Sequence, residues 1–242
     1  MKTVVIVQAR MTSTRLPGKV LKEVLGRPLL DYQIERLRCM TMADQIVVAT
    51  TMMKTDDPIV ELCKKLGIAF YRGPEADVLA RYYGAAVEFG ADTVVRITAD
   101  CPVIDPVISD KAVRVFLTHR KQYDYISLEG FPRGMDTEVF PFTVLEECWQ
   151  EAVAEPDREH VTPYIYHHPE RYRLKRLLCS TDYSHHRWTV DTLEDFELIR
   201  RVIEELYPVK PKFDMEDILT VMNKYPDWYA INAKVRQKGY GE

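Results

Sequence analysis

A run of basic and hydroxyl side chains follows the first apolar segment of the chain. Residues 8–19 read QARMTSTRLPGK, which places Arg10, Arg15 and Lys19 among three hydroxyl residues and a glycine. Arginine binds phosphate oxygens through parallel hydrogen bonds, lysine supplies a positive charge on a flexible stem, and glycine lets backbone N–H groups approach an anion. The segment has neither the GxxxxGK[ST] nor the GxGxxG pattern. It predicts another kind of phosphate-binding loop, and the alternative is an ordinary basic surface loop.

A carboxylate stands beyond a second apolar segment. Asp100 follows residues 93–98 in the string TADCP. Mg²⁺ takes oxygen ligands and keeps several waters, so one or two carboxylates beside substrate phosphates are enough to bind it. The alternative is that Asp100 caps the turn that follows. Because Asp105 already stands before Pro106 as a helix cap, we favour metal binding for Asp100.

Asp191 is a second carboxylate of this kind, in the string RWTVDTLED. Thr192 and Asp195 have the spacing of a capping box, so they are predicted to be structural. Asp191 just precedes the helix and is free to point elsewhere. Spacing alone does not pair it with Asp100.

Two further groups are weaker candidates. Arg72 and Asp77 stand in the string RGPEAD. Arg72 could contact a base or a phosphate, and Asp77 could contact the amino edge of a base. The alternative is that this segment only begins a helix, which we prefer for Asp77. Asp136 and Glu138 would share one face of a strand and could accept hydrogen bonds from sugar hydroxyls, while Arg133 would suit a carboxylate. A solvated strand edge is an equal alternative for this group.

The elements that must position these residues alternate regularly in the first half. Strands are predicted at residues 4–7, 45–51, 68–71 and 93–98, and helices at 28–38, 56–66, 75–89 and 105–120, with Gly67 as a C-cap. Continuous apolar strands between helices predict a parallel sheet covered on both faces. Ligands of such sheets lie beyond the carboxyl ends of the strands, where the loops after Val7, Tyr71 and Thr98 meet.

The second half is less regular. We expect strands at residues 123–128, 136–140 and 171–178, and helices at 143–154, 158–167, 193–206, 214–223 and 228–236. No repeat or linker is visible. One domain over residues 1–242 is the economical prediction, in two parts, residues 1–120 and 121–242.

Composition narrows the class of protein. The 242 residues are 46% hydrophobic and 29% charged, with a net charge of -4, which argues against a dedicated nucleic-acid binder. Five cysteines without a CxxC pair, and adjacent histidine pairs, argue against disulfides or zinc. No apolar stretch is long enough for a membrane span or a signal peptide, so a cytoplasmic protein without a membrane partner is expected.

Several of these strings occur together in one known family. The chain resembles the CMP-sugar synthetases, cytidylyltransferases that activate sugars, and in particular their spore coat polysaccharide branch. The resemblance rests on residues 9–21 (ARMTSTRLPGKVL), 81–86 (RYYGAA), 96–106 (RITADCPVIDP), 132–140 (PRGMDTEVF), 157–166 (DREHVTPYIY) and 188–199 (WTVDTLEDFELI), and so covers most of the chain.

The resemblance implies a fold, a reaction and a set of roles. The fold is a three-layer, Rossmann-like nucleotidyltransferase with a mostly parallel sheet, and the reaction transfers CMP from CTP to a sugar with release of pyrophosphate. Asp100 and Asp191 would bind Mg²⁺, and Lys19 and Arg15 would join them in catalysis. CTP would contact the following residues: Ala9, Arg10, Met11, Ser13, Arg15, Lys19, Arg72 and Asp77. On the chemistry of their side chains, we expect Arg133, Asp136 and Glu138 to contact the sugar. Residues 1–120 would then form the nucleotide-binding half and residues 121–242 the sugar-binding and oligomerisation half.

The same resemblance leaves other features open. Family members are commonly homodimers. Where many synthetases carry a Gly-Asp-x-Pro segment, this chain has Ala99 before Asp100, so the usual acidic sugars do not follow automatically. Two alternatives are a sugar-nucleotide-dependent glycosyltransferase, which would normally carry a DxD triplet that residues 100–102 lack, and a nucleotide-binding regulator without catalysis, against which both retained aspartates speak.

Overall fold

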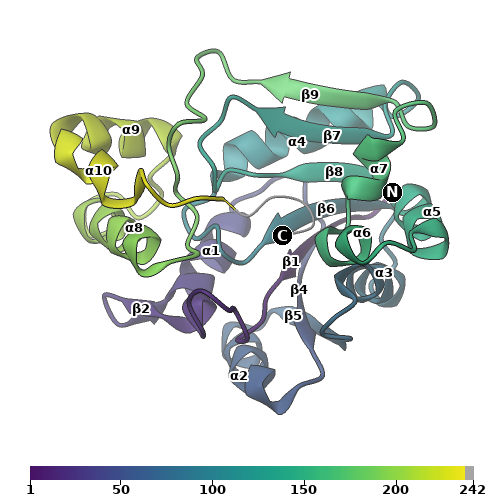
Figure 1. The fold of residues 1–242 in the computed structure, drawn as a ribbon, viewed down its shortest axis with the longest axis horizontal. Coiled ribbons are helices and arrows are strands. Elements are labelled where there is room, and N and C mark those ends of the chain that lie inside the picture. Colours follow the sequence, from purple (N-terminus) through teal and green to yellow (C-terminus); the bar gives the residue numbers. More distant parts are fainter. Residues whose placement is uncertain (238–242) are drawn as a thin grey trace.

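A seven-stranded sheet runs through the computed structural model, which describes residues 1–237 (Figure 1). Its strand order is β5-β4-β1-β6-β8-β7-β9. The N-terminal side of the sheet consists of β1 (Thr3–Gln8), β4 (Gln45–Thr51), β5 (Ala69–Gly73) and β6 (Thr93–Thr98), all paired in parallel. Residues 4–7 of β1 are fully buried, because both faces of a parallel sheet are covered by helices.

The remaining strands extend the sheet on the other side of β6. They are β7 (Tyr125–Glu129), β8 (Glu138–Pro141) and β9 (Leu174–Leu178). The strand β8 lies between β6 and β7 and is antiparallel to both, while β7 and β9 are parallel. The sheet is therefore mostly parallel, as predicted.

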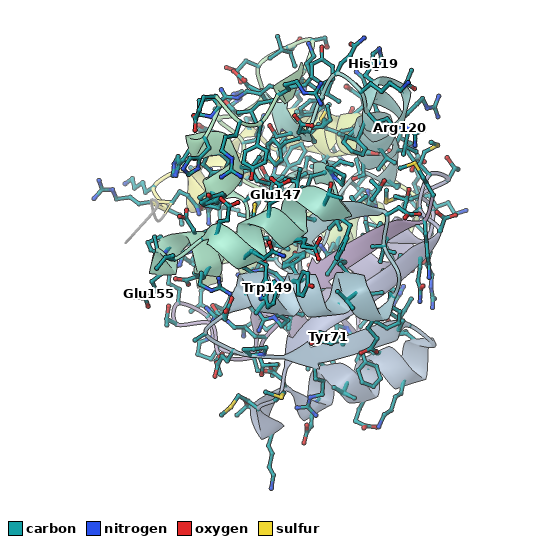
Figure 2. The ribbon with its side chains drawn as sticks, turned by 90° about the vertical axis from the view of Figure 1, so that its right-hand side faces the viewer. Tyr71, His119, Arg120, Glu147, Trp149 and Glu155 are labelled. Carbon is teal, nitrogen blue, oxygen red and sulfur yellow. The ribbon has the colours of Figure 1, made fainter. Side chains whose placement is uncertain are left out.

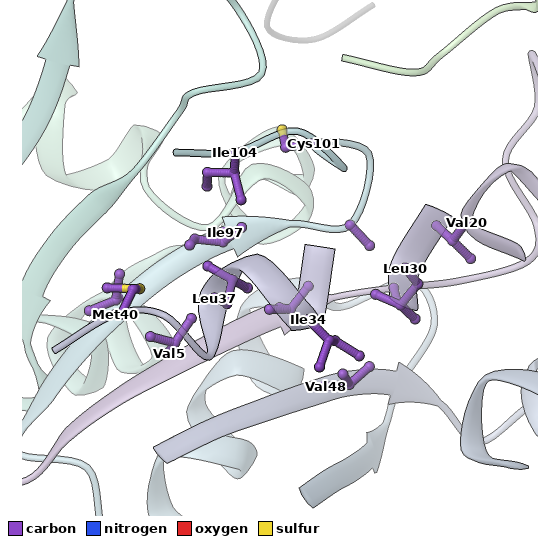
Figure 3. Packing of buried hydrophobic residues seen from close by; sticks show 14 of the residues in the cluster. Val5, Val20, Leu30, Ile34, Leu37, Met40, Val48, Ile97, Cys101 and Ile104 are labelled. Atoms are coloured by element: carbon purple, nitrogen blue, oxygen red, sulfur yellow. The ribbon is translucent and has the colours of Figure 1, made fainter. Parts of the chain in front are cut away.

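Helices cover both faces of the sheet. On one face lie α1 (Leu29–Leu37), α2 (Asp57–Leu66) and α4 (Pro106–His119), and Figure 3 shows Leu30 and Ile34 of α1 close to Val48 of β4. On the other face lie α3 (Val78–Glu88) and α5 (Phe142–Glu151), which Figure 2 presents to the viewer. Tyr83 of α3 and Trp149 of α5 stack with ring centroids 4.1 Å apart. The three layers confirm the predicted fold class.

A third apolar cluster lies beside the sheet. It joins α8 (Leu193–Leu206) and α9 (Met215–Lys224) to Trp188 and to the hairpin of β2 (Glu23–Val24) and β3 (Arg27–Pro28). Capping boxes begin both helices, and the predicted pair Thr192 and Asp195 forms the box of α8. Burial of Trp188 fixes the segment that leads into α8, and this segment carries Asp191.

Several predicted boundaries were wrong. The single helix expected at residues 158–167 is two helices, α6 (Glu155–His160) and α7 (Pro163–His167), because Val161 has a positive φ of 75° and Pro163 starts a new helix. The helix expected at residues 228–236 is a 3-10 turn, η3 (Pro226–Trp228), followed by a short α10 (Tyr229–Asn232). Short 3-10 turns also occur at η1 (Lys19–Leu21) and η2 (Lys54–Asp56). Within residues 1–237, no helix has the length and apolarity needed to cross a membrane.

Candidate active site

A cavity of about 610 Å³ opens at the carboxyl ends of β1 and β6. It is lined by residues from both halves of the chain. The sequence-predicted site residues that line it are Ala9, Arg10, Ser13, Arg15, Lys19, Asp100, Arg133, Asp136, Glu138 and Asp191. The predicted residues Met11, Arg72 and Asp77 do not line it. Tertiary structure has thus brought the basic loop and the two separate aspartates into one space.

The ammonium group of Lys19 lies between the two aspartates. Its Nζ is 2.9 Å from Oδ2 of Asp100 and 2.7 Å from Oδ1 of Asp191. The three side chains are only 12%, 22% and 11% exposed, in that order, so little water screens them. Thr98 and Asp100 are linked by a hydrogen bond of 2.5 Å from the threonine hydroxyl to Oδ1. This cluster is the electrostatic centre of the cavity.

The cluster shifts the pKa values of its members in opposite directions. Burial by itself would raise the pKa of Asp100, but the charge of Lys19 and the hydrogen bond from Thr98 outweigh it and hold the pKa at about 2. Burial would lower the pKa of Lys19, but Asp100 and Asp191 outweigh it and raise that pKa above 10.5. Both groups are therefore charged throughout the neutral range.

These shifts predict a pH dependence of stability for the metal-free protein. Because the pKa of Asp100 is lowered, this carboxylate stabilises the fold at pH values above its ordinary pKa of 3.8. The contribution is lost as the pH falls towards 2. The raised lysine pKa contributes below 10.5 and is lost at higher pH. We expect the difference in urea midpoint between wild type and Asp100→Asn to stay constant from about pH 5 to 9 and to shrink below about pH 4. A difference that grows in acid would contradict this ion pair.

Backbone contacts bring Asp191 to Asp100 although 90 residues separate them. The carbonyl oxygen of Asp100 accepts hydrogen bonds from Val190 N at 2.8 Å and from the Thr189 hydroxyl at 3.1 Å. The chain can pass here because Gly134 has φ 104° and no side chain: a β-carbon at this position would lie 2.6 Å from the Trp188 carbonyl oxygen. The PRGMD and WTVD strings are therefore one structural unit.

Two arginines complete the surroundings of Asp191. Oδ2 of Asp191 lies 2.9 Å from Arg15 and 2.7 Å from Arg187. Arg187 also pairs with the fully buried Asp195 at 2.8 Å. The sequence reasoning missed Arg187, although it stands directly before the WTVD string. Its bonds fix the orientation of the Asp191 carboxylate.

The basic loop is held in place by a residue outside it. The buried Asp56 accepts hydrogen bonds from Met11 N at 2.8 Å and from the Thr51 hydroxyl at 2.5 Å. Gly18 N donates to the Met11 carbonyl at 2.8 Å and closes the loop. The side chain of Met11 packs on the core cluster that includes α1 and α2. Met11 therefore shapes the loop instead of lining the cavity, and Asp56, predicted only as part of a helix start, organises it.

Arg72 and Asp77 are committed to other partners. The Arg72 guanidinium donates to the Thr51 and Met53 carbonyls, both at 2.8 Å, and pairs with Asp57 at 2.7 Å. Asp77 caps α3 by accepting from Ala80 N at 2.8 Å, as in the helix-entry alternative, and it pairs with Arg158 at 2.6 Å. The structure does not bring either side chain into the cavity, because β5 is an edge strand and both residues tie its loop to neighbouring helices.

The predicted sugar-binding group is divided. The strand β8 starts only at Glu138, so Asp136 precedes it and accepts a hydrogen bond from Gly134 N at 2.9 Å. Glu138 is paired across the strands with Arg96 and accepts from the Tyr125 and Thr162 hydroxyls. Asp136 and the exposed Arg133 line the cavity without an ion pair to any residue in 1–237. Glu138 is therefore the member of this group whose carboxylate oxygens already bind other side chains of the protein.

The donor set of Asp100 and Asp191 fits a divalent cation that keeps other ligands. No group of three or more His, Cys, Asp or Glu side chains within residues 1–237 could hold a metal ion by itself. In this structure both carboxylates contact one positive group, the Lys19 ammonium. Mg²⁺ in phosphate-binding sites is likewise held by only one or two protein carboxylates. A basic loop and paired carboxylates at the mouth of this sheet suit the class of enzymes that bind a nucleoside triphosphate together with a divalent cation.

Comparisons with known proteins identify the branch of this class. The family model for cytidylyltransferases matches residues 4–224. Uncharacterized protein MJ1063 of Methanocaldococcus jannaschii is 38% identical over 244 residues, covering 100% of this chain and 99% of that protein. Spore coat polysaccharide biosynthesis protein SpsF of Bacillus subtilis is 33% identical over 229 residues, covering 92% and 94%. The solved structure of a cytidylyltransferase from Leptospira borgpetersenii serovar Hardjo-bovis has a TM-score of 0.91 at 33% identity and covers 99% of this chain and 100% of that one.

The chain belongs to the cytidylyltransferase family. It is a CTP-dependent nucleotidyltransferase, which confirms the predicted class of enzyme. The family decides against the glycosyltransferase alternative and against a regulator without catalysis.

Proposed function

We propose that this enzyme transfers CMP from CTP to a sugar hydroxyl, with Mg²⁺ as cofactor and pyrophosphate as the second product. The observation that carries the proposal is the Lys19 ammonium between Asp100 and Asp191, at the point where the basic loop, β6 and the segment before α8 meet. A hydroxyl oxygen bonds to the α-phosphorus, the bond to the pyrophosphate oxygen breaks, and the hydroxyl proton passes to solvent. Such a reaction needs in-line positioning and positive charge and no covalent enzyme nucleophile.

The basic loop supplies the positive charge. Lys19 and Arg15 hold aspartates in the ligand-free enzyme and exchange them for phosphate oxygens when CTP binds, since both side chains are long and their charges are already in the cavity. Arg10 is 4.0 Å from Glu159 and only loosely held, so it is free to join them. Asp100 and Asp191 would then hold the cation. When bound, the cation polarises the phosphoryl oxygen and lowers the pKa of the attacking hydroxyl.

The acceptor occupies the other side of the cavity, along β7 and β8. Arg133 and Asp136 provide a positive and a negative group there, which suits an acidic or an amino sugar. The relative SpsF is named for polysaccharide synthesis, which supports a role in making cell-surface or spore-coat polysaccharide. A homodimer in the cytoplasm completes the proposal, and sedimentation of the purified protein would test its oligomeric state.

Arg133→Ala is expected to raise the KM for the sugar by about 10- to 100-fold, since a charge-assisted hydrogen bond contributes roughly 1.5–3 kcal/mol. The KM for CTP should stay within about twofold, because Arg133 lies on the acceptor side. Steady-state kinetics with each substrate varied in turn measure this. Arg176→Ala on β9, outside the cavity lining, is the matched control. An equal rise in both KM values would reject the assignment of Arg133 to the sugar.

The overall proposal is tested by pyrophosphate release from CTP with a panel of acidic, amino and neutral sugars. Release that requires both a sugar and a divalent cation supports it, and the product should be the CMP-sugar by mass spectrometry. If CTP binds but none of the sugars in the panel leads to pyrophosphate release, the proposal that a sugar is the acceptor is contradicted.

A further inference from the structure

The chain returns to the active site after α10, in residues 233–237, which we call the strap. Figure 1 shows this segment turning back from α10 towards the middle of the sheet. At its end, Gln237 lines the same cavity as Lys19 and the two aspartates. The match to the cytidylyltransferase family model ends at residue 224, so the strap lies outside the region that identifies the family. A segment distant in sequence from the basic loop thus forms part of the wall of the active site.

The strap starts from a buried asparagine. Asn232, the last residue of α10, is 3% exposed. Its Nδ2 donates hydrogen bonds to the Arg187 carbonyl and to Oδ1 of Asp195, both at 2.8 Å. Because buried polar groups need such partners, this amide fixes where α10 lies against the segment before α8. The start of the strap is therefore attached to Arg187, the residue that pairs with Asp191.

The other end of the strap is attached to two arginine side chains. Oε1 of Gln237 accepts a hydrogen bond from Nη1 of Arg187 at 2.7 Å. The carbonyl oxygen of Arg236 lies 3.4 Å from Nη1 of Arg15. Between these ends, residues 234–236 line a cavity of about 500 Å³ together with residues of α10 and of the start of α8. Polar contacts at its two ends, rather than close packing along its length, therefore set the path of the strap.

The contact with Gln237 completes the surroundings of the Arg187 guanidinium. Its Nε and Nη2 donate to Asp195 at 2.8 and 3.1 Å, and Nη2 also donates to Asp191 at 2.7 Å. The remaining nitrogen, Nη1, is the one that Gln237 holds. Because a guanidinium is planar, bonds to all three nitrogens fix both its position and its plane. Without the strap, the guanidinium would be held from one side only.

The two carboxylate oxygens of Asp191 have different partners. Oδ1 contacts the Lys19 ammonium at 2.7 Å, whereas Oδ2 contacts Arg15 at 2.9 Å and Arg187 at 2.7 Å. In the proposed function, Lys19 and Arg15 move to phosphate oxygens when CTP binds. The side chain of Arg187 does not line the cavity and is held by its other bonds, so it stays on Oδ2. After the exchange, the orientation of this carboxylate therefore depends on Arg187.

We infer that the strap positions the metal-binding carboxylate of Asp191 through Arg187. Asn232 and Gln237 are the positioning residues, and they act through the guanidinium and not by contact with the cation. With Oδ2 held by Arg187, Oδ1 is the oxygen that becomes available when Lys19 leaves. Partners behind a metal ligand orient that ligand and so raise the affinity for the metal. The inference rests on the divalent cation of the proposed function, and it adds a part of the chain that the reaction depends on.

Titration of the 242-residue enzyme with Mn²⁺ at a fixed concentration of CTP, followed by electron paramagnetic resonance, tests this inference. Gln237→Met removes the acceptor oxygen and should weaken Mn²⁺ binding by about threefold to tenfold, less than the roughly 10- to 100-fold typical of a direct partner of a metal ligand. Its affinity for CTP without a divalent cation should stay within about twofold, because the lost bond goes to Arg187 and not to the basic loop. Gln150→Met, at an exposed position on α5, is the matched control and should behave like wild type.

Two further variants separate positioning from a general effect on the fold. Gln237→Glu keeps an acceptor oxygen for Arg187 and should bind Mn²⁺ at least as tightly as wild type. Asn232→Ala should weaken Mn²⁺ binding by about tenfold. It should also lower the melting temperature, since the buried Asp195 loses a donor. If Asn232→Ala does not fold, the variants of the exposed Gln237 decide the question by themselves.

Wild-type affinity for Mn²⁺ in Gln237→Met would overturn the inference, and so would equal losses in Gln237→Met and Gln237→Glu. Weaker binding of CTP by Gln237→Met in the absence of metal would overturn it in favour of a direct contact with the nucleotide. If wild type itself bound no Mn²⁺ with CTP, the cation of the proposed function would be contradicted, and the inference with it. A failed sugar panel leaves these binding results unaffected, so the failure of the sugar acceptor is distinguishable from the failure of the strap.

Discussion

Asp100→Asn is expected to lower kcat by at least about 10³-fold, because a polarising cation contributes several kcal/mol to such a transition state and each 1.36 kcal/mol is tenfold in rate. Asparagine keeps the size of the side chain and its hydrogen bond with Thr98, so the fold should survive. The lower kcat should result from weaker binding of the metal. Titration with Mn²⁺ in the presence of CTP, followed by electron paramagnetic resonance, is expected to show weaker metal binding.

The matched control for this variant is Asp227→Asn, at an exposed aspartate in η3. It changes the net charge by the same amount and should leave kcat and metal affinity at wild-type values. If Asp100→Asn turned over at a normal rate, the assignment of Asp100 to the metal would be lost. A slow variant with normal metal affinity would instead assign Asp100 to positioning Lys19.

Lys19→Ala is expected to lower turnover strongly and, at the same time, to strengthen metal binding in the absence of nucleotide. Loss of a preorganised cation at the phosphates lowers kcat by roughly 10²–10³-fold. Removal of the ammonium also leaves Asp100 and Asp191 without the charge between them, so the metal-free protein should lose about 3 kcal/mol of stability. A divalent cation no longer competes with Lys19 and should restore that loss.

Thermal unfolding with and without Mg²⁺ measures this second effect. The melting temperature of Lys19→Ala should rise more with Mg²⁺ than that of wild type, and Lys64→Ala on α2, an exposed lysine, should behave like wild type. An equal rise in wild type and Lys19→Ala would mean that the lysine and the cation do not share the two carboxylates. The prediction thus separates a direct competition from a general loss of stability.

Most of the residues predicted for the site line one cavity, and the reason is identifiable. The basic loop and Asp100 each follow a buried strand of a parallel sheet, and the carboxyl ends of such strands meet at one edge. The hydrophobic periodicity of the sequence and its continuous apolar strands therefore predicted that these residues lie at one edge of the sheet, without any knowledge of distant contacts. Arg72 lies near the end of β5 and Asp77 follows it, yet β5 is the outermost strand, and these side chains pair with Asp57 of α2 and Arg158 of α6.

Local pattern by itself determined the alternation of strands and helices, the capping box before α8, the glycine end of α2 and the chemistry of the basic loop. Only the tertiary structure decided which aspartates meet, because the contact of Val190 with Asp100 depends on Gly134 and on the burial of Trp188 far along the chain. Side-chain pairing across the fold is a long-range property, so spacing along the sequence does not contain it.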